Sequence, residues 1–142
     1  MKSLGSLYQF AKKKNITIIN VPLPQTGSLA LEGPNGCYIG LDLRQMPNES
    51  CHRVHLAHEI GHCVTGSFYS RYTAVDSRQR HENRADKNAI RRLIPVAELD
   101  EAVSCGCTQM WELAEHFGVT EEFMRRAVCL YTHGNLSTEL YF

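Results

Sequence analysis

The chain reads LAHEIGH at residues 56–62, and this stretch decides how the rest of the sequence is interpreted. His58 and His62 are four residues apart, so on a helix both imidazoles project from the same face. One zinc ion can accept a nitrogen from each ring, at roughly 2.0–2.1 Å. Glu59 points about 100° further around the helix axis, where it lies beside the metal and can take a proton from a water molecule. We therefore predict two metal ligands, His58 and His62, and a catalytic base, Glu59.

The residues on either side favour a helix around this motif. Asn48 or Ser50 can cap its start, and Gly66 is placed to end it after about Thr65. Gly61 lies inside the helix, where a glycine costs about 1 kcal/mol relative to alanine. We expect another element to approach closely at Gly61 and so to offset that cost.

A catalytic zinc site usually has three protein ligands, so the motif needs one more. The pattern that adds a glycine and a third histidine fails, because Thr65 and Phe68 occupy those positions. Glu82 lies 20 positions after His62, on a second helix expected at residues 78–94. A helix that folds back can bring this carboxylate to the histidines, and we predict Glu82 as the third ligand.

Asp86 follows Glu82 by four residues and therefore lies on the same face of the expected helix. We predict that its carboxylate accepts the free N–H of a ligating histidine and thereby fixes the tautomer. Ala85 and Ala89 continue this face and would let the two helices pack closely. His81 is the main rival as third ligand, but it points about 100° away from Glu82.

Local patterns along the chain predict one α+β domain over residues 1–142, with a core over residues 1–95 and a helical C-terminal subregion over residues 96–142. We expect one helix, then a small antiparallel sheet of three strands, then five helices. The expected strands are residues 16–21, 28–32 and 37–43, and the expected helices are residues 3–14, 48–65, 78–94, 95–103, 108–117 and 120–131.

The composition is that of an ordinary globular protein. Hydrophobic residues make up 43% of the 142 residues and charged residues 21%. Fifteen basic and fifteen acidic residues cancel, which removes any global electrostatic basis for binding nucleic acid or an anionic membrane. Residues 1–15 lack the apolar core of a signal peptide, and no segment is apolar enough to span a bilayer. We expect a cytoplasmic protein with no membrane partner.

The six cysteines are expected to be reduced thiols in that compartment. Cys105-Gly-Cys107 could hold a metal, but a single C-x-C is weak evidence and a tight turn is the preferred interpretation. Cys63 adjoins His62 and could act as a fourth ligand, which would close the site to catalysis. It leaves the helix at another angle, so we predict a buried thiol.

Residues 111–131 resemble a helix-turn-helix pair around a Phe-Gly-Val-Thr turn. A helix that enters DNA should be basic near its start, whereas this one begins Glu121-Glu122. We therefore do not expect direct nucleic-acid binding, and favour packing or the docking of a protein partner.

Taken together, these motifs resemble the ImmA/IrrE family of metallopeptidases. The resemblance rests on LAHEIGH at residues 56–62 and on ENRADKNAIRRLIP at residues 82–95. IGLD at residues 39–42 and ELAEHFGVT at residues 112–120 also look like the family's. The polar and basic residues at positions 87, 88, 91 and 92 depart from it, because relatives are often more apolar there.

The resemblance implies a minimal zincin fold with His58, His62 and Glu82 as zinc ligands and Glu59 as general base. It also implies a phage or mobile-element protein that cleaves or otherwise relieves a cognate helix-turn-helix repressor. Two other classes stay open: a non-catalytic binding protein (an anti-repressor) that retains its zinc, and a DNA-binding regulator. The residue that stabilises the oxyanion is not determined by the sequence; the candidates are Tyr69, Tyr72, His55 and His81. The substrate and the oligomeric state are not predicted either.

Overall fold

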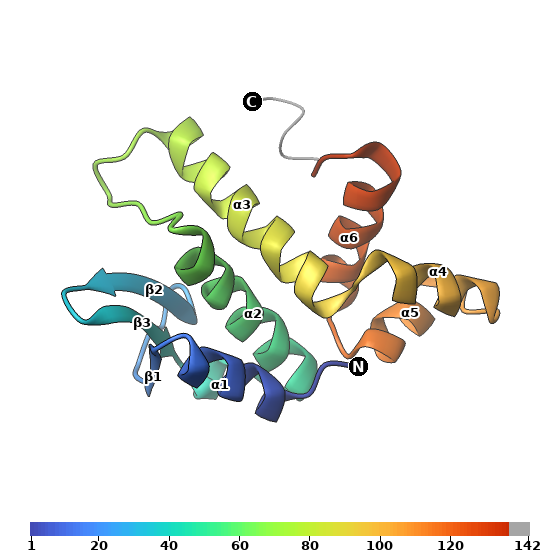
Figure 1. Ribbon diagram of the computed structural model, residues 1–142, viewed down its shortest axis with the longest axis horizontal. Helices are drawn as coiled ribbons and strands as arrows, with labels where there is room; N and C mark the ends of the chain where they lie inside the picture. The colour runs from blue at the N-terminus through green and yellow to red at the C-terminus, as the bar shows by residue number, and fades with distance from the viewer. Residues whose placement is uncertain (137–142) are drawn as a thin grey trace.

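The computed structural model describes residues 1–136. In these residues six α-helices and a three-stranded sheet form an α+β fold, compatible with a small zincin-like domain (Figure 1). The order of elements is α1 (Leu4–Lys13), β1 (Ile16–Asn20), β2 (Ser28–Gly33), β3 (Gly36–Leu41), a 3-10 turn (Leu43–Gln45), α2 (Glu49–Thr65), α3 (Val75–Leu93), α4 (Val96–Ser104), α5 (Met110–Phe117) and α6 (Glu121–His133). The predicted sequence of helix, sheet and five helices is therefore confirmed.

The sheet is mixed, so the predicted antiparallel sheet is wrong in one of its two pairings. Strand order is β1-β3-β2, with β2 antiparallel and β1 parallel to β3. β2 and β3 form a hairpin, because a tight turn between Gly33 and Gly36 joins them. The segment after β1 carries the chain across the sheet, and β1 is left to pair with the far edge of β3. Within residues 1–136, this arrangement leaves one edge of β2 unpaired.

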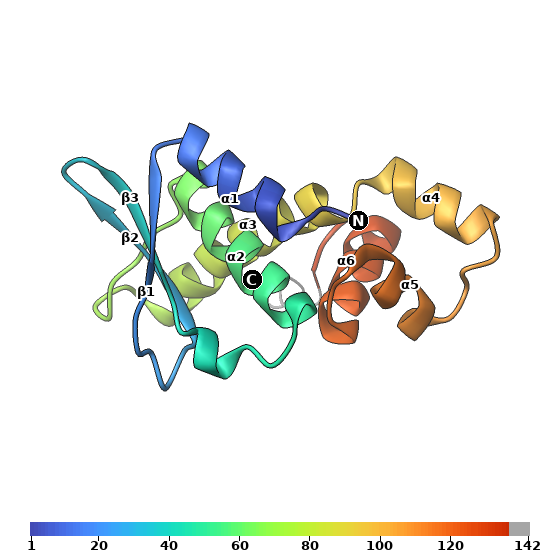
Figure 2. The ribbon, with the colours of Figure 1, turned by 90° about the horizontal axis from the view of Figure 1, so that it is seen from below.

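Helices α2 and α3 lie side by side and form the centre of the molecule (Figures 1 and 2). The Asn48 side chain caps α2 by accepting the Cys51 N–H at 2.8 Å, and Gly66, with φ 68°, ends it in a left-handed conformation. The expected close approach at Gly61 is confirmed, because a Cβ there would lie 2.5 Å from the carbonyl oxygen of Ala85. The missing side chain of Gly61 thus sets the spacing of the two helices.

The C-terminal helices α5 and α6 pack against each other, and α6 also contacts α3. The apolar core extends into them through the buried side chains of Phe117 and Phe123. Arg53, itself buried on α2, ties this part to the N-terminus: its guanidinium donates to the carbonyl oxygens of Lys2 and Gly118. The division at residue 95 stays a prediction, and residues 137–142 of the predicted C-terminal subregion lie outside the described residues.

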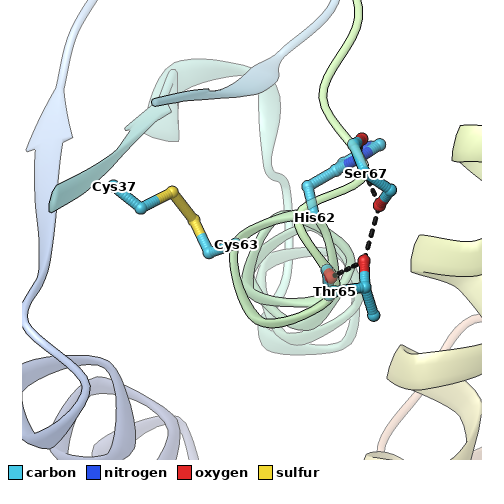
Figure 3. The surroundings of a disulfide bond; sticks show 6 residues. Cys37, His62, Cys63, Thr65 and Ser67 are labelled. Atoms are coloured by element: carbon cyan, nitrogen blue, oxygen red, sulfur yellow. Dashed lines mark hydrogen bonds between the residues drawn. A yellow bond between two sulfur atoms is a disulfide. The ribbon is translucent and has the colours of Figure 1, made fainter. Parts of the chain in front are cut away.

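Cys37 and Cys63 form a disulfide, so the prediction that all six cysteines are reduced is wrong for this pair (Figure 3). β3 packs against α2, which brings the two Cα atoms to 5.9 Å, a distance that a disulfide spans. The other four cysteines are free thiols. A pairing over 26 residues depends on how the sheet meets the helix, which local sequence does not encode.

α3 begins at Val75, three residues before the predicted start at Arg78. Its basic residues do not disturb the packing, because the Arg92 guanidinium lies 4.1 Å from the centre of the Phe10 ring and covers it. Within residues 1–136, none of the helices is both long and apolar enough to cross a membrane.

Candidate metal centre

Three side chains of types that can bind a metal converge where α2 faces α3. The Nε2 atoms of His58 and His62 are 3.2 Å apart. The Glu82 carboxylate on α3 lies 2.8 Å from His58 Nε2 through Oε2 and 3.1 Å from His62 Nε2 through Oε1. Within residues 1–136 these three form the one group of side chains whose ligand atoms could share an ion. The helical periods of α2 and α3 therefore bring together the three residues that we predicted as ligands.

The tautomers of both histidines follow from the groups that hold their other ring nitrogens. His58 Nδ1 lies 2.7 Å from Asp86 Oδ1, and His62 Nδ1 lies 2.6 Å from the carbonyl oxygen of Ser67. Both partners accept hydrogen bonds, so each Nδ1 carries a proton. In the neutral imidazoles the Nε2 atoms then present lone pairs, and these face each other and the Glu82 oxygens.

Such a convergence of acceptors needs a cation between them. Two imidazole nitrogens and one carboxylate, with acceptors behind both rings, match the donor set and the supporting hydrogen bonds of a zinc site. The residues present therefore fit the ion that the sequence analysis implied. Asp86 lies where we predicted it, behind His58, and its second oxygen accepts a hydrogen bond from Arg126 on α6 at 3.3 Å.

Hydrogen bonds at the centre raise the pKa of His58 and lower the pKa of Glu82, and both shifts favour an ion pair between the two. Burial disfavours the imidazolium form of His58, but hydrogen bonds to Asp86 and Glu82 outweigh it and raise the pKa to about 10. Burial likewise opposes the charged form of Glu82, yet hydrogen bonds to His58 and His62 lower its pKa well below the usual value. The metal-free site thus holds a proton in the place that an ion would take.

Glu59 lies beside this centre and is 5% exposed. Burial raises the pKa of its carboxyl group, and the neighbouring His58 charge and a hydrogen bond from Ser28 oppose that rise. Ser28 Oγ is 2.7 Å from Glu59 Oε2 and 2.7 Å from His55 Nδ1. Ser28 was not predicted as a site residue, because nothing near it in the sequence indicates a partner 31 residues away on α2.

The structure separates the four candidates for the oxyanion-stabilising residue. The Tyr69 hydroxyl donates to Glu82 Oε1 at 2.7 Å and so borders the metal centre. Tyr72 is 82% exposed and outside the cleft lining, and His81 stacks on the Tyr69 ring at 6.2 Å. His55 is held by Ser28. Tyr69 is therefore the candidate whose polar group borders the ligands.

No fourth protein ligand closes the centre within residues 1–136. Cys63 is bonded to Cys37, and its side chain leaves α2 toward β3 while His62 points toward Ser67 (Figure 3). His81 stands behind Tyr69 and is not part of the ligand group. An ion held here would keep an open coordination position, as catalytic sites require.

The ligands line a cleft with a volume of about 910 Å³. Its walls come from α2, α3, the start of α6 and the strand β2, which contributes Ser28 to Leu31. The cleft therefore runs beside the unpaired edge of the sheet. A chain segment lying in it would contact both the metal centre and that edge.

Comparison with known proteins gives one family. The family model described as IrrE N-terminal-like domain, Peptidase M78, matches residues 11–128. This range includes β1 to β3, the whole of α2 and α3, and most of α6. No curated protein and no solved structure matched the chain.

Proposed function

Because the chain belongs to the IrrE N-terminal-like domain family, Peptidase M78, we propose that it is a zinc-dependent endopeptidase that cleaves a specific cytoplasmic protein. The family supports a metallopeptidase-type function, and His58, His62 and Glu82 could bind a metal. The choice of zinc, the cytoplasmic location and the catalytic role of Glu59 are parts of the proposal.

One observation carries this proposal: acceptor atoms from three side chains converge in the lining of a cleft, with a buried carboxylate beside them. A structural metal site would be closed by a fourth side chain, and the described residues offer none. A binding protein without catalysis would have no use for Glu59, because burying its carboxyl group costs free energy.

In the proposed reaction the residues of the chain have separate tasks. A zinc ion held by His58, His62 and Glu82 would act as a Lewis acid toward a peptide carbonyl and a water molecule. Glu59 removes the proton of the attacking water and returns it to the amine nitrogen that leaves. Tyr69 can turn its hydroxyl from Glu82 to the carbonyl oxygen as that atom gains negative charge.

The cleft supports a polypeptide as substrate. β2 is an edge strand, and its residues Ser28 to Leu31 line the cleft. An extended peptide can add to such an edge through main-chain hydrogen bonds, which are available to any sequence. We propose as substrate a helix-turn-helix repressor from the same phage or mobile element, recognised by docking outside the cleft as well.

A cleavage assay tests this function. The zinc-loaded protein is incubated with the repressor encoded by the neighbouring gene, with and without a chelator, and mass spectrometry identifies the fragments. We expect one or a few cuts that require zinc and that Glu59→Gln abolishes while it retains zinc. Cleavage at the wild-type rate by zinc-loaded Glu59→Gln would overturn the mechanism.

The same mixture distinguishes the two alternatives. An anti-repressor would form a stable complex with the intact repressor, and Glu59→Gln would leave its effect unchanged. A DNA-binding regulator would be retained on duplex DNA in a strongly salt-dependent way without the repressor. Arg126, one of the two arginines on α6 that could contact phosphate, is already paired with Asp86 and Glu122, which disfavours this alternative.

A further inference from the structure

Ser28 connects the sheet to the proposed catalytic base. It lies at the start of β2, is 7% exposed, and places its hydroxyl between two residues of α2 that are one helical turn apart. These are His55 and Glu59, each 2.7 Å from Ser28 Oγ. Glu59 reaches no other hydrogen-bond donor within residues 1–136.

The number of protons in these groups determines the donor and the acceptor of each hydrogen bond. The Ser28 hydroxyl has one proton and donates it to Glu59 Oε2, because an ionised carboxylate only accepts. Ser28 Oγ must then accept from His55 Nδ1, which fixes the Nδ1–H tautomer of that ring. The chain of hydrogen bonds therefore runs from His55 through Ser28 to Glu59, and it occupies one carboxylate oxygen and leaves the other free.

We infer that Ser28, oriented by His55, is a positioning residue that holds Glu59 with Oε1 toward the cleft as the proton acceptor. The inference rests on the proposed peptidase function and specifies how its base is aligned. A glutamate side chain has three rotatable bonds, and a buried one without a donor would turn toward whichever cation is nearest. The hydrogen bond from Ser28 gives Glu59 Oε2 one fixed partner and thereby restricts this rotation.

A purely structural role would predict different behaviour. If Ser28 only satisfied a buried carboxylate, its loss would lower the stability of the fold and affect zinc and substrate binding together. A positioning role predicts that zinc binding and KM stay nearly unchanged while kcat falls. The loss in kcat should be roughly tenfold to a hundredfold, since small misplacements of a reacting group cost up to about that much.

The test compares Ser28→Ala with Ser28→Thr, which restores a hydroxyl and suits a strand. Ser104→Ala, at the end of α4, is the matched control for loss of a serine hydroxyl. The substrate is chosen first, as the peptide that the wild type cuts fastest in a proteome-derived peptide library. The zinc content of each zinc-loaded protein is then measured, together with kcat and KM on that peptide. Two-bond ¹H–¹⁵N NMR spectra of the histidine rings report the tautomer of His55 independently of activity.

We expect the wild type to show the Nδ1–H tautomer of His55 and Ser28→Ala to lose it, because free histidine favours Nε2–H. Ser28→Ala should bind zinc and show a KM like the wild type, but its kcat should fall. Ser28→Thr should recover most of the wild-type kcat. An unchanged kcat in Ser28→Ala would overturn the inference, and so would a weaker zinc affinity and a raised KM that accompany the fall in kcat. The Nε2–H tautomer of His55 in the wild type would also overturn it. None of these results would by itself contradict the proposed function. If the wild type cuts no library peptide and no repressor, the proposed function itself is wrong.

Discussion

The helix pairs α2–α3 and α5–α6 are joined in different ways. α2 and α3 meet through backbone at Gly61 and Ala85, and the polar side chains of Glu59, His62 and Asp86 are buried near their contact. α5 and α6 bury large apolar side chains, with Phe117 and Phe123 each 1% exposed. The first pair buries polar and ionisable groups that need hydrogen bonds or a cation as partners, whereas the second contributes apolar burial. Substitutions should therefore affect metal binding in one pair and stability in the other.

The largest effect that this comparison predicts is the loss of metal binding in His62→Ala. Removing one of three ligands leaves two, and the cavity left by the ring admits water to the centre. We expect the variant to remain folded by circular dichroism and to bind no stoichiometric zinc in a chelator competition. His116→Ala on α5 is the matched control and should bind zinc like the wild type. A variant that still binds zinc as tightly would show that His62 is not a ligand.

Next in size is the loss of stability in Phe123→Ala. Truncating a buried phenylalanine costs about 3–5 kcal/mol through lost burial and the cavity that remains. Urea unfolding should show this loss, while the folded fraction keeps its zinc affinity. A large fall in zinc affinity without a loss of stability would contradict the separation between the two helix pairs.

A third prediction concerns Asp86→Ala, which removes the acceptor behind His58. Loss of such a partner typically lowers metal affinity about 10- to 100-fold, because the ring is no longer held in the binding tautomer. Asp86→Asn keeps an acceptor oxygen and should lie between Ala and the wild type. Arg126→Ala removes the other partner of Asp86 and should change zinc affinity less than Asp86→Ala does. Equal effects of Asp86→Ala and Asp86→Asn would mean that the charge of Asp86 matters more than its contact with His58.

The stability of the metal-free protein should depend on pH through the polar contact between α2 and α3. The pKa of His58 is raised from 6.5 to about 10, so its ion pair stabilises the fold fully below about pH 6.5, and this contribution is lost as the pH rises toward 10. A proton must leave His58 before a metal binds, so zinc affinity should rise over the same range. Urea midpoints of the metal-free wild type should fall between these pH values, and His58→Gln should lose most of that slope. A flat wild-type profile would contradict the ion pair.

The smallest effect is expected at Arg125 on the exposed face of α6. Its guanidinium lies 3.1 Å from Glu121, and both side chains are largely in solvent. Such a pair contributes about 0.3–0.5 kcal/mol, so Arg125→Ala should barely move the urea midpoint. Zinc affinity should not change. A loss of more than about 1 kcal/mol would show that α6 depends on surface charge as well as on apolar burial.

The convergence of His58, His62 and Glu82 was predictable because its pattern is local. His58 and His62 lie one helical turn apart, and Glu82 and Asp86 repeat that spacing on α3, so periodicity places each pair on one face of its helix. The parallel pairing of β1 with β3 was not predictable, since a strand pattern does not name its neighbour. The contacts of Cys37 with Cys63 and of Ser28 with Glu59 were not predicted from the sequence, for a related reason. Both join the sheet to α2, and their distances exist only after that packing is formed.

Gly61 limits how a chain of this kind can change over evolutionary time. Alanine is the smallest available replacement, and its single methyl group would already meet the backbone of Ala85, which no rotamer change can relieve. The helix that carries Glu82 would have to move as a body, and the carboxylate would leave the two histidines together with it. A chain that keeps this packing of α2 on α3 is therefore expected to keep the glycine, although Gly61 is not among the three residues that could bind a metal.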